Sequence, residues 1–100
     1  MMKALKALVE SKTDKRIGNH AVRQSSYFTI KDDEIYFVGG SKDGVTRSFS
    51  YHNSFICHVD DKQRRVYLTN CGWNTISTTR ALNDYRRYFV DELGYTEVSA

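Results

Sequence analysis

The residues of this 100-residue sequence that could carry chemistry are two cysteines, three histidines and a hydroxyl-rich stretch around the single tryptophan. A closed zinc site needs four ligands at short characteristic spacings, and the cysteines and histidines do not show them. Cys57 and His58 are adjacent in a run typical of a strand, so their side chains leave opposite faces and cannot readily share one ion. We therefore expect no metal site and no cofactor, with Cys57 in the interior and His58 on the surface.

Cys71 is the candidate nucleophile, because it precedes a glycine and lies shortly before a helix start, a setting that can lower a thiol pKa. Spacing singles out none of His20, His52 and His58 as its base, and no acid is placed to orient one. The motifs G-x-S-x-G and H-E-x-x-H and a phosphate-binding loop are absent from the sequence. We expect a protein that is not an enzyme. A catalytic role would require His20 or His52 to lie against Cys71.

The stretch LTNCGWNTISTT at residues 68–79 has two interpretations. As a structural corner, it ends a strand, turns, places Trp73 in the gap between sheet and helix, and caps the helix with the hydroxyls of Thr75, Thr78 and Thr79. A helix N-terminus with hydroxyls around it can also bind an anion, and Arg80 lies in the first turn of this helix. We favour the structural interpretation.

The order of the elements predicts an α+β fold in one domain spanning residues 1–100. Apolar residues recur at helical spacing over residues 2–11 and 78–93, and strand-like runs separated by short turn signals fill the region between. The expected strands cover residues 26–31, 34–39, 45–51, 54–59 and 65–69, as an antiparallel meander of about five strands flanked by the two helices. The candidate core comprises Leu5, Leu8, Phe28, Ile30, Ile35, Phe37, Phe49, Ile56, Val66, Leu68, Leu82, Tyr85 and Phe89.

Outward-facing tyrosines form the candidate binding surface. If the apolar residues of the first two strands point inward, Tyr27 and Tyr36 point outward, and Tyr67 does so on the last strand. Basic residues precede these strands, because residues 1–23 carry six Lys or Arg and two acids. We add Arg16 and Arg23 to this surface. Tyrosines beside cations can stack single-stranded nucleic acid, but they can also pair across strands without a ligand.

Composition limits the class of protein further. The sequence has 40% hydrophobic residues, no proline, two cysteines and a net charge of +3. It has no apolar run of roughly 20 residues, the length that spans a membrane. These properties are typical of a soluble intracellular protein with free thiols and no membrane partner. An exposed edge strand, at residues 26–31 or 45–51, could pair with its copy in a homodimer.

The segment from Tyr51 to Tyr85 resembles a block found in small uncharacterised proteins of tailed bacteriophages. The likeness rests on Cys71-Gly72-Trp73, Thr75, the pair Thr78-Thr79 and Leu82-Asn83, and it covers about a third of the chain. The sequence departs from that block in the spacing after Trp73 and at Ala81, and residues 1–45 match nothing in it. The resemblance implies a phage accessory protein made in the host bacterial cytoplasm, and it implies no catalytic residues.

Two functional hypotheses follow from these observations. In the first, the chain is a non-enzymatic phage accessory protein that binds and inhibits a host bacterial protein, in host takeover or in countering host defence, an anti-CRISPR-like role included. In the second, the same tyrosines and the basic N-terminal loop bind RNA or single-stranded DNA. Steep loss of affinity with salt would indicate nucleic acid, whereas a protein interface built on aromatic residues would be less sensitive.

Overall fold

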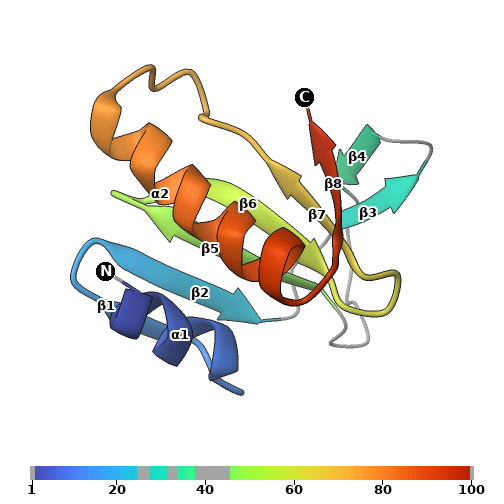
Figure 1. The fold of residues 1–100 in the computed structure, drawn as a ribbon, viewed down its shortest axis with the longest axis horizontal. Coiled ribbons are helices and arrows are strands. Elements are labelled where there is room, and N and C mark those ends of the chain that lie inside the picture. The colour runs from blue at the N-terminus through green and yellow to red at the C-terminus, as the bar shows by residue number, and fades with distance from the viewer. Residues whose placement is uncertain (1, 25–27, 32–33, 38–45, 100) are drawn as a thin grey trace.

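The computed structural model describes residues 2–24, 28–31, 34–37 and 46–99 and has an α+β architecture (Figure 1). Its helices are α1 (Met2–Glu10) and α2 (Ile76–Arg86), and α2 continues into a π-helical stretch, η1 (Arg87–Glu92). Its strands are β1 (Lys15–Ile17), β2 (His20–Gln24), β3 (Phe28–Lys31), β4 (Glu34–Phe37), β5 (Thr46–Tyr51), β6 (Ser54–Asp60), β7 (Arg65–Leu68) and β8 (Thr96–Ser99).

The main sheet has six strands in the order β1-β2-β5-β6-β7-β8. Neighbouring strands are antiparallel except β7 and β8, which are parallel because the chain crosses over through α2 and η1 between them. The expectation of a purely antiparallel five-stranded meander is therefore wrong in its strand number, and the sheet is mixed because the additional strand β8 runs parallel to β7. Three strands were not predicted: β8, and β1 and β2, which are joined by a turn at Gly18 and Asn19.

The second sheet is the two-stranded hairpin of β3 and β4, which the sequence predicts as a hairpin but places within the main sheet. Phe28 and Ile30 of this hairpin pack with Tyr67 and Val98, on the face of the main sheet opposite the helices. Both faces of the main sheet are therefore covered, the second one in part. The ends of the predicted strands at residues 26, 27, 38, 39 and 45 lie outside the described residues.

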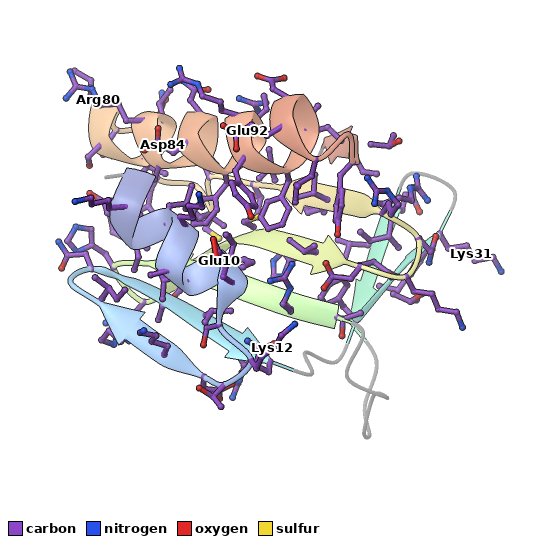
Figure 2. All side chains as sticks on the ribbon, turned by 60° about the horizontal axis from the view of Figure 1, so that its bottom comes forward. Glu10, Lys12, Lys31, Arg80, Asp84 and Glu92 are labelled. Carbon is purple, nitrogen blue, oxygen red and sulfur yellow. The ribbon has the colours of Figure 1, made fainter. Side chains whose placement is uncertain are left out.

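The two helices lie side by side on the other face, as two views show (Figures 1 and 2). Leu5 and Leu8 of α1 and Tyr85 and Phe89 of the second helix are fully buried against the sheet, as predicted. The longer helix begins at Ile76, two residues before the predicted start, and Gly94 ends it at a φ of +76°. None of the helices in the described part of the chain is long and apolar enough to cross a membrane.

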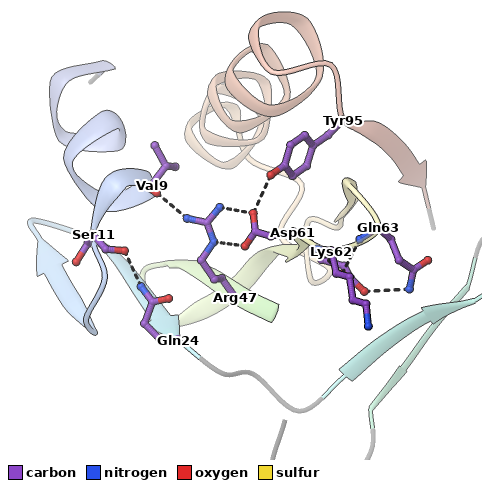
Figure 3. Close-up of polar contacts among 9 residues, drawn as sticks. Val9, Ser11, Gln24, Arg47, Asp61, Lys62, Gln63 and Tyr95 are labelled. Atoms are coloured by element: carbon purple, nitrogen blue, oxygen red, sulfur yellow. Dashed lines mark hydrogen bonds and ion pairs between the residues drawn. The ribbon is translucent and has the colours of Figure 1, made fainter. Parts of the chain in front are cut away.

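Arg47 on β5 ties the end of α1 to the sheet (Figure 3). Its guanidinium donates to both carboxylate oxygens of Asp61 at 2.8 Å and to the carbonyl oxygen of Val9 at 2.6 Å. The hydroxyl of Tyr95, just beyond η1, donates to the same carboxylate at 2.8 Å. This network joins both helical elements to one end of the sheet. The hollow beside it is lined by polar groups that are largely engaged with one another.

The prediction that His58 lies on the surface is wrong, because the residue is buried, with 5% of it exposed. His58 and Cys57 do point to opposite faces of β6, as predicted. The face that carries His58 is covered by the hairpin, however, and Phe28 packs edge-on against the imidazole. The predicted edge strand at residues 45–51 is also wrong. It corresponds to β5, which lies inside the sheet between β2 and β6, whereas the edges of the main sheet are β1 and β8.

Candidate binding site

One corner of the molecule combines a cavity with exposed hydrophobic side chains, and a tight turn forms its first wall. His52 and Asn53 join β5 to β6 with φ values of 50° and 67°, the left-handed pair of a two-residue hairpin turn. A register shift opposite Phe49 and Ser50 leaves Ile56 unpaired, so Ile56 and Cys57 are both buried in the core on the helix side. The bulge thus places Ile56 in the cavity wall.

The loop after β7 forms the second wall. Cys71 and Gly72 have φ values of 53° and 82° and reverse the chain, and the amide of Trp73 donates to the carbonyl oxygen of Asn70 at 2.8 Å. The indole then reaches back to β6, where its Nε1 donates to the hydroxyl of Ser54 at 3.1 Å. Trp73 is therefore held in place, yet 58% of it is exposed. The expectation that it fills the gap between sheet and helix is wrong.

The start of α2 closes the corner with hydroxyl groups. Thr75 is the N-cap residue, and its Oγ1 accepts from the amide of Thr78 at 3.2 Å and donates to the Thr78 hydroxyl at 2.9 Å. The hydroxyl of Thr79 donates to the carbonyl oxygen of Thr75 at 3.0 Å. These hydroxyls are engaged in capping the helix. Capping by these hydroxyls is what the structural interpretation of this stretch expects.

Between these walls lies a cavity of about 330 Å³, within the range of sites that accept a side chain or a small ligand. It is lined by Tyr51, His52, Ser54, Ile56, Trp73, Thr75, Ser77 and Thr78. Ile76, between two lining residues, is 75% exposed, the highest value among the large hydrophobic residues whose exposure the structure describes. We call the lining residues together with Ile76 the Trp73 corner. It offers an aromatic surface, an exposed aliphatic side chain and a hollow for a third apolar group.

Cations lie on both sides of the Trp73 corner. Arg16 donates to the amide oxygen of Asn53 at 3.0 Å and so lies beside the turn that carries His52. Arg80 is one helical turn beyond Ser77, and it projects into solvent at the start of α2 (Figure 2). Residues 46–59 and 62–83, which supply the whole corner, contain no Asp or Glu. The corner is therefore neutral to positive.

The structure does not bring the predicted tyrosines and arginines together. Tyr36 is 46% exposed on the outer side of the hairpin, where its hydroxyl donates to Glu34 at 2.6 Å. Tyr67 is half-buried beneath that same hairpin, among the residues that pack against Phe28 and Ile30. Tyr27 lies outside the described residues.

The two arginines of the predicted surface lie at the other edge of the main sheet. Arg16 is on β1, and Arg23 on β2 lies over the ring of Phe55, 5.7 Å from its centroid. The described side chains of the predicted surface thus fall into separate groups, and neither Tyr36 nor Tyr67 lies with both arginines.

In the described part of the chain, the Cys71 thiol and the Ser48 hydroxyl are candidate nucleophiles. The Cys71 thiol donates to the carbonyl oxygen of Phe55 at 2.9 Å, and burial raises its pKa, so the loop does not activate it. Within the described ranges no hydrogen bond joins Cys71 to a histidine. Ser48 and His58 do form a pair, with Oγ and Nδ1 2.9 Å apart, but both residues are buried. The described residues also contain no cluster of His, Cys, Asp or Glu suited to a metal ion.

Sequence reasoning selected Trp73 but missed Ile76, Tyr51 and Ile56 as parts of the same site. The helical pattern could have indicated that Ile76 is exposed. At 100° per residue, Ile76 lies about 120° from Leu82 and therefore outside the stripe of residues expected to be buried. This signal was missed because the predicted helix began at residue 78 and did not include Ile76. The contribution of Tyr51 and Ile56 depends on the β5–β6 register and its bulge, which no local pattern specifies.

Comparison of the chain with protein-family models, with curated proteins and with solved structures gives no match. The site is therefore interpreted from its own geometry.

Proposed function

We propose that this protein is a non-catalytic binding protein that attaches to a protein partner through the Trp73 corner. The observation that carries the proposal is the exposure of Trp73 and Ile76, at 58% and 75%, beside a cavity with aromatic and aliphatic walls. Tryptophan is enriched among the residues that dominate protein–protein binding energies, particularly next to pockets that exclude water. The indole is already oriented by its hydrogen bond to Ser54, so little conformational entropy is lost when a partner covers it.

The resemblance of residues 51–85 to a bacteriophage block includes the tryptophan and the paired threonines of this corner. It makes a host bacterial protein the class of partner to test first, with inhibition of that protein as the consequence. Nucleic-acid binding remains the alternative outcome. Its support is weaker, because the hairpin separates Tyr36 from Tyr67 and these two tyrosines do not form one surface.

The test is capture from bacterial lysate by the immobilised full chain and by two variants, Trp73→Ala and Tyr36→Ala. Tyr36→Ala is a matched control, because it removes an exposed aromatic ring away from the corner. We expect one protein to be retained by the wild type and by Tyr36→Ala after nuclease treatment and a high-salt wash, and lost from Trp73→Ala. Nucleic acid released by salt, or a partner retained equally by Trp73→Ala, would contradict the proposal. Circular dichroism of each variant checks that the fold is kept.

A further inference from the structure

We infer that the Trp73 corner recognises an acidic segment of its partner, with one large apolar side chain entering the cavity and carboxylates on either side of it. The inference rests on the proposed function and adds the chemistry of the occupant. It is based on the distribution of charge around the cavity.

The cavity itself selects an apolar group. Its walls include the indole of Trp73, the ring of Tyr51 and the buried side chain of Ile56. The hydroxyls of Ser54, Thr75 and Thr78 on its rim already take part in hydrogen bonds, since Ser54 accepts from Trp73 and Thr75 donates to Thr78. A polar group entering the cavity would meet few free partners, so desolvation favours a leucine, methionine or aromatic side chain.

The surroundings of the cavity select negative charge. Arg16 lies on the side of the β5–β6 turn and Arg80 on the side of α2, and the segments that form the walls contain no acid. The nearest acid along α2 is Asp84, one turn beyond Arg80. Asp84 lies close enough to His20 to raise the pKa of its imidazole, although burial lowers this pKa by more. A partner with carboxylates next to its apolar side chain therefore meets two cations, and neither of them is in an ion pair with a described acid.

The experiment selects binders from a library of random twelve-residue peptides displayed on a carrier, with the full-length protein as bait and Trp73→Ala for counter-selection. Selected sequences are synthesised, and their affinities are measured by the intrinsic fluorescence of Trp73, which is the only tryptophan in the chain and so reports on the site itself. We expect enrichment of a large apolar residue flanked by Asp or Glu.

Variants then separate the two parts of the inference. Arg16→Gln and Arg80→Gln should each weaken binding of an acidic peptide about threefold, the usual size for an exposed ion pair. Arg87→Gln is the matched control, because Arg87 is an exposed arginine at the start of η1, about two helical turns beyond Arg80, and it should leave the affinity unchanged. Trp73→Phe should retain most of the binding, measured with a labelled peptide, whereas Trp73→Ala should lose at least thirtyfold.

The possible results distinguish this inference from the function on which it rests. Peptides that need Trp73 but show no enrichment of acids, and that ignore Arg16→Gln and Arg80→Gln, would overturn the inference and leave the proposed function intact. Failure to select any peptide that depends on Trp73 would overturn both. Acidic peptides that bind Trp73→Ala as tightly as the wild type would place the acidic site elsewhere and also overturn the inference.

Discussion

The helix side and the hairpin side of the main sheet bury different kinds of residue. On the helix side, α1, α2 and η1 cover one continuous apolar cluster that includes Leu5, Phe49, Tyr85 and Phe89. On the hairpin side, the buried apolar cluster among the described residues is smaller and consists of Phe28, Ile30 and Val98. Buried polar residues cluster on this side, including Ser48, which pairs with His58 across β5 and β6.

This difference indicates that the helices and the hairpin are attached to the main sheet in different ways. A large apolar cluster shared by several elements makes their folding cooperative, because removing one contact exposes surface on all of them. The hairpin, in contrast, depends on a few apolar contacts and on polar contacts such as the donation from Gln63 Nε2 to the Ile30 carbonyl oxygen at 3.2 Å. We expect the hairpin to open locally at a lower free energy than the rest of the domain.

The largest expected effect comes from truncating one phenylalanine on each side. Phe89→Ala should lower the free energy of unfolding by about 3–5 kcal/mol, because it leaves a cavity in the shared cluster. Phe28→Ala removes the same group from an equally buried site, but the hairpin alone can relax, so the global loss should be clearly smaller. Urea unfolding followed by circular dichroism gives the global values, and hydrogen exchange of the β3 and β4 amides should accelerate only in Phe28→Ala. Equal global losses would mean that the two sides unfold as one unit.

The second prediction concerns the dependence of stability on pH, which we expect to arise mainly from His58 on the hairpin side. Burial lowers the pKa of His58 from 6.5 to about 4, so the unfolded chain binds a proton more readily than the native one between these values. Stability is therefore full above pH 6.5 and is lost as the pH falls towards 4, by about 2 kcal/mol between pH 7.5 and pH 5. Urea midpoints measured at half-unit steps of pH would show this loss.

A matched pair of variants assigns that pH dependence to one histidine. His58→Gln should remove most of the slope, since glutamine does not titrate. Burial also lowers the pKa of His20 on the helix side, but nearby Asp84 opposes it, so His20→Gln should remove less. A slope that survives His58→Gln unchanged would assign the acid sensitivity to other groups.

The third prediction tests the ion pair between Arg47 and Asp61 on the helix side. Asp61→Asn leaves Arg47, which is 13% exposed in its side chain, without its countercharge, and should lower stability by roughly 1–2 kcal/mol, since Asp61 is partly open to solvent. Burial and the hydrogen bond to Asp61 raise the pKa of Tyr95 to about 12. In Asp61→Asn this pKa should fall but stay above 10, because burial persists, and an NMR titration of the tyrosine ring would measure it. An unchanged pKa would mean that the Asp61 contact contributes little in solution.

The helix side was largely predictable because its signal is local. The 3.6-residue periodicity of residues 2–11 and 78–93 selects Leu5, Leu8, Tyr85 and Phe89, and each of them is buried. The predicted strands at residues 45–51 and 54–59 leave two residues between them, and His52 and Asn53 there adopt the left-handed conformation that a two-residue turn requires.

The hairpin side depends on contacts between distant parts of the chain. Whether β3 and β4 extend the main sheet or pack on its face is decided by Tyr67 and Val98, which lie more than 30 residues away in sequence. The burial of His58 follows from that choice, and so does the separation of Tyr36 from Tyr67. The candidate site shows the same division. Trp73 stood out in the sequence, whereas the place of Ile56 in the wall of the same cavity depends on the bulge in β6.

The smallest expected effect compares the two buried histidines through their hydrogen-bond partners. Tyr85→Phe on the helix side leaves His20 Nδ1 without the hydroxyl that lies 3.1 Å away, and Ser48→Ala on the hairpin side leaves His58 Nδ1 without its partner at 2.9 Å. Each change should lower the free energy of unfolding by about 1 kcal/mol, because a buried polar atom becomes unsatisfied. The readouts should differ, since only Ser48→Ala should also speed hydrogen exchange in the hairpin that covers His58. Faster hairpin exchange in Tyr85→Phe as well would show that the two sides of the sheet are coupled through β5 and β6.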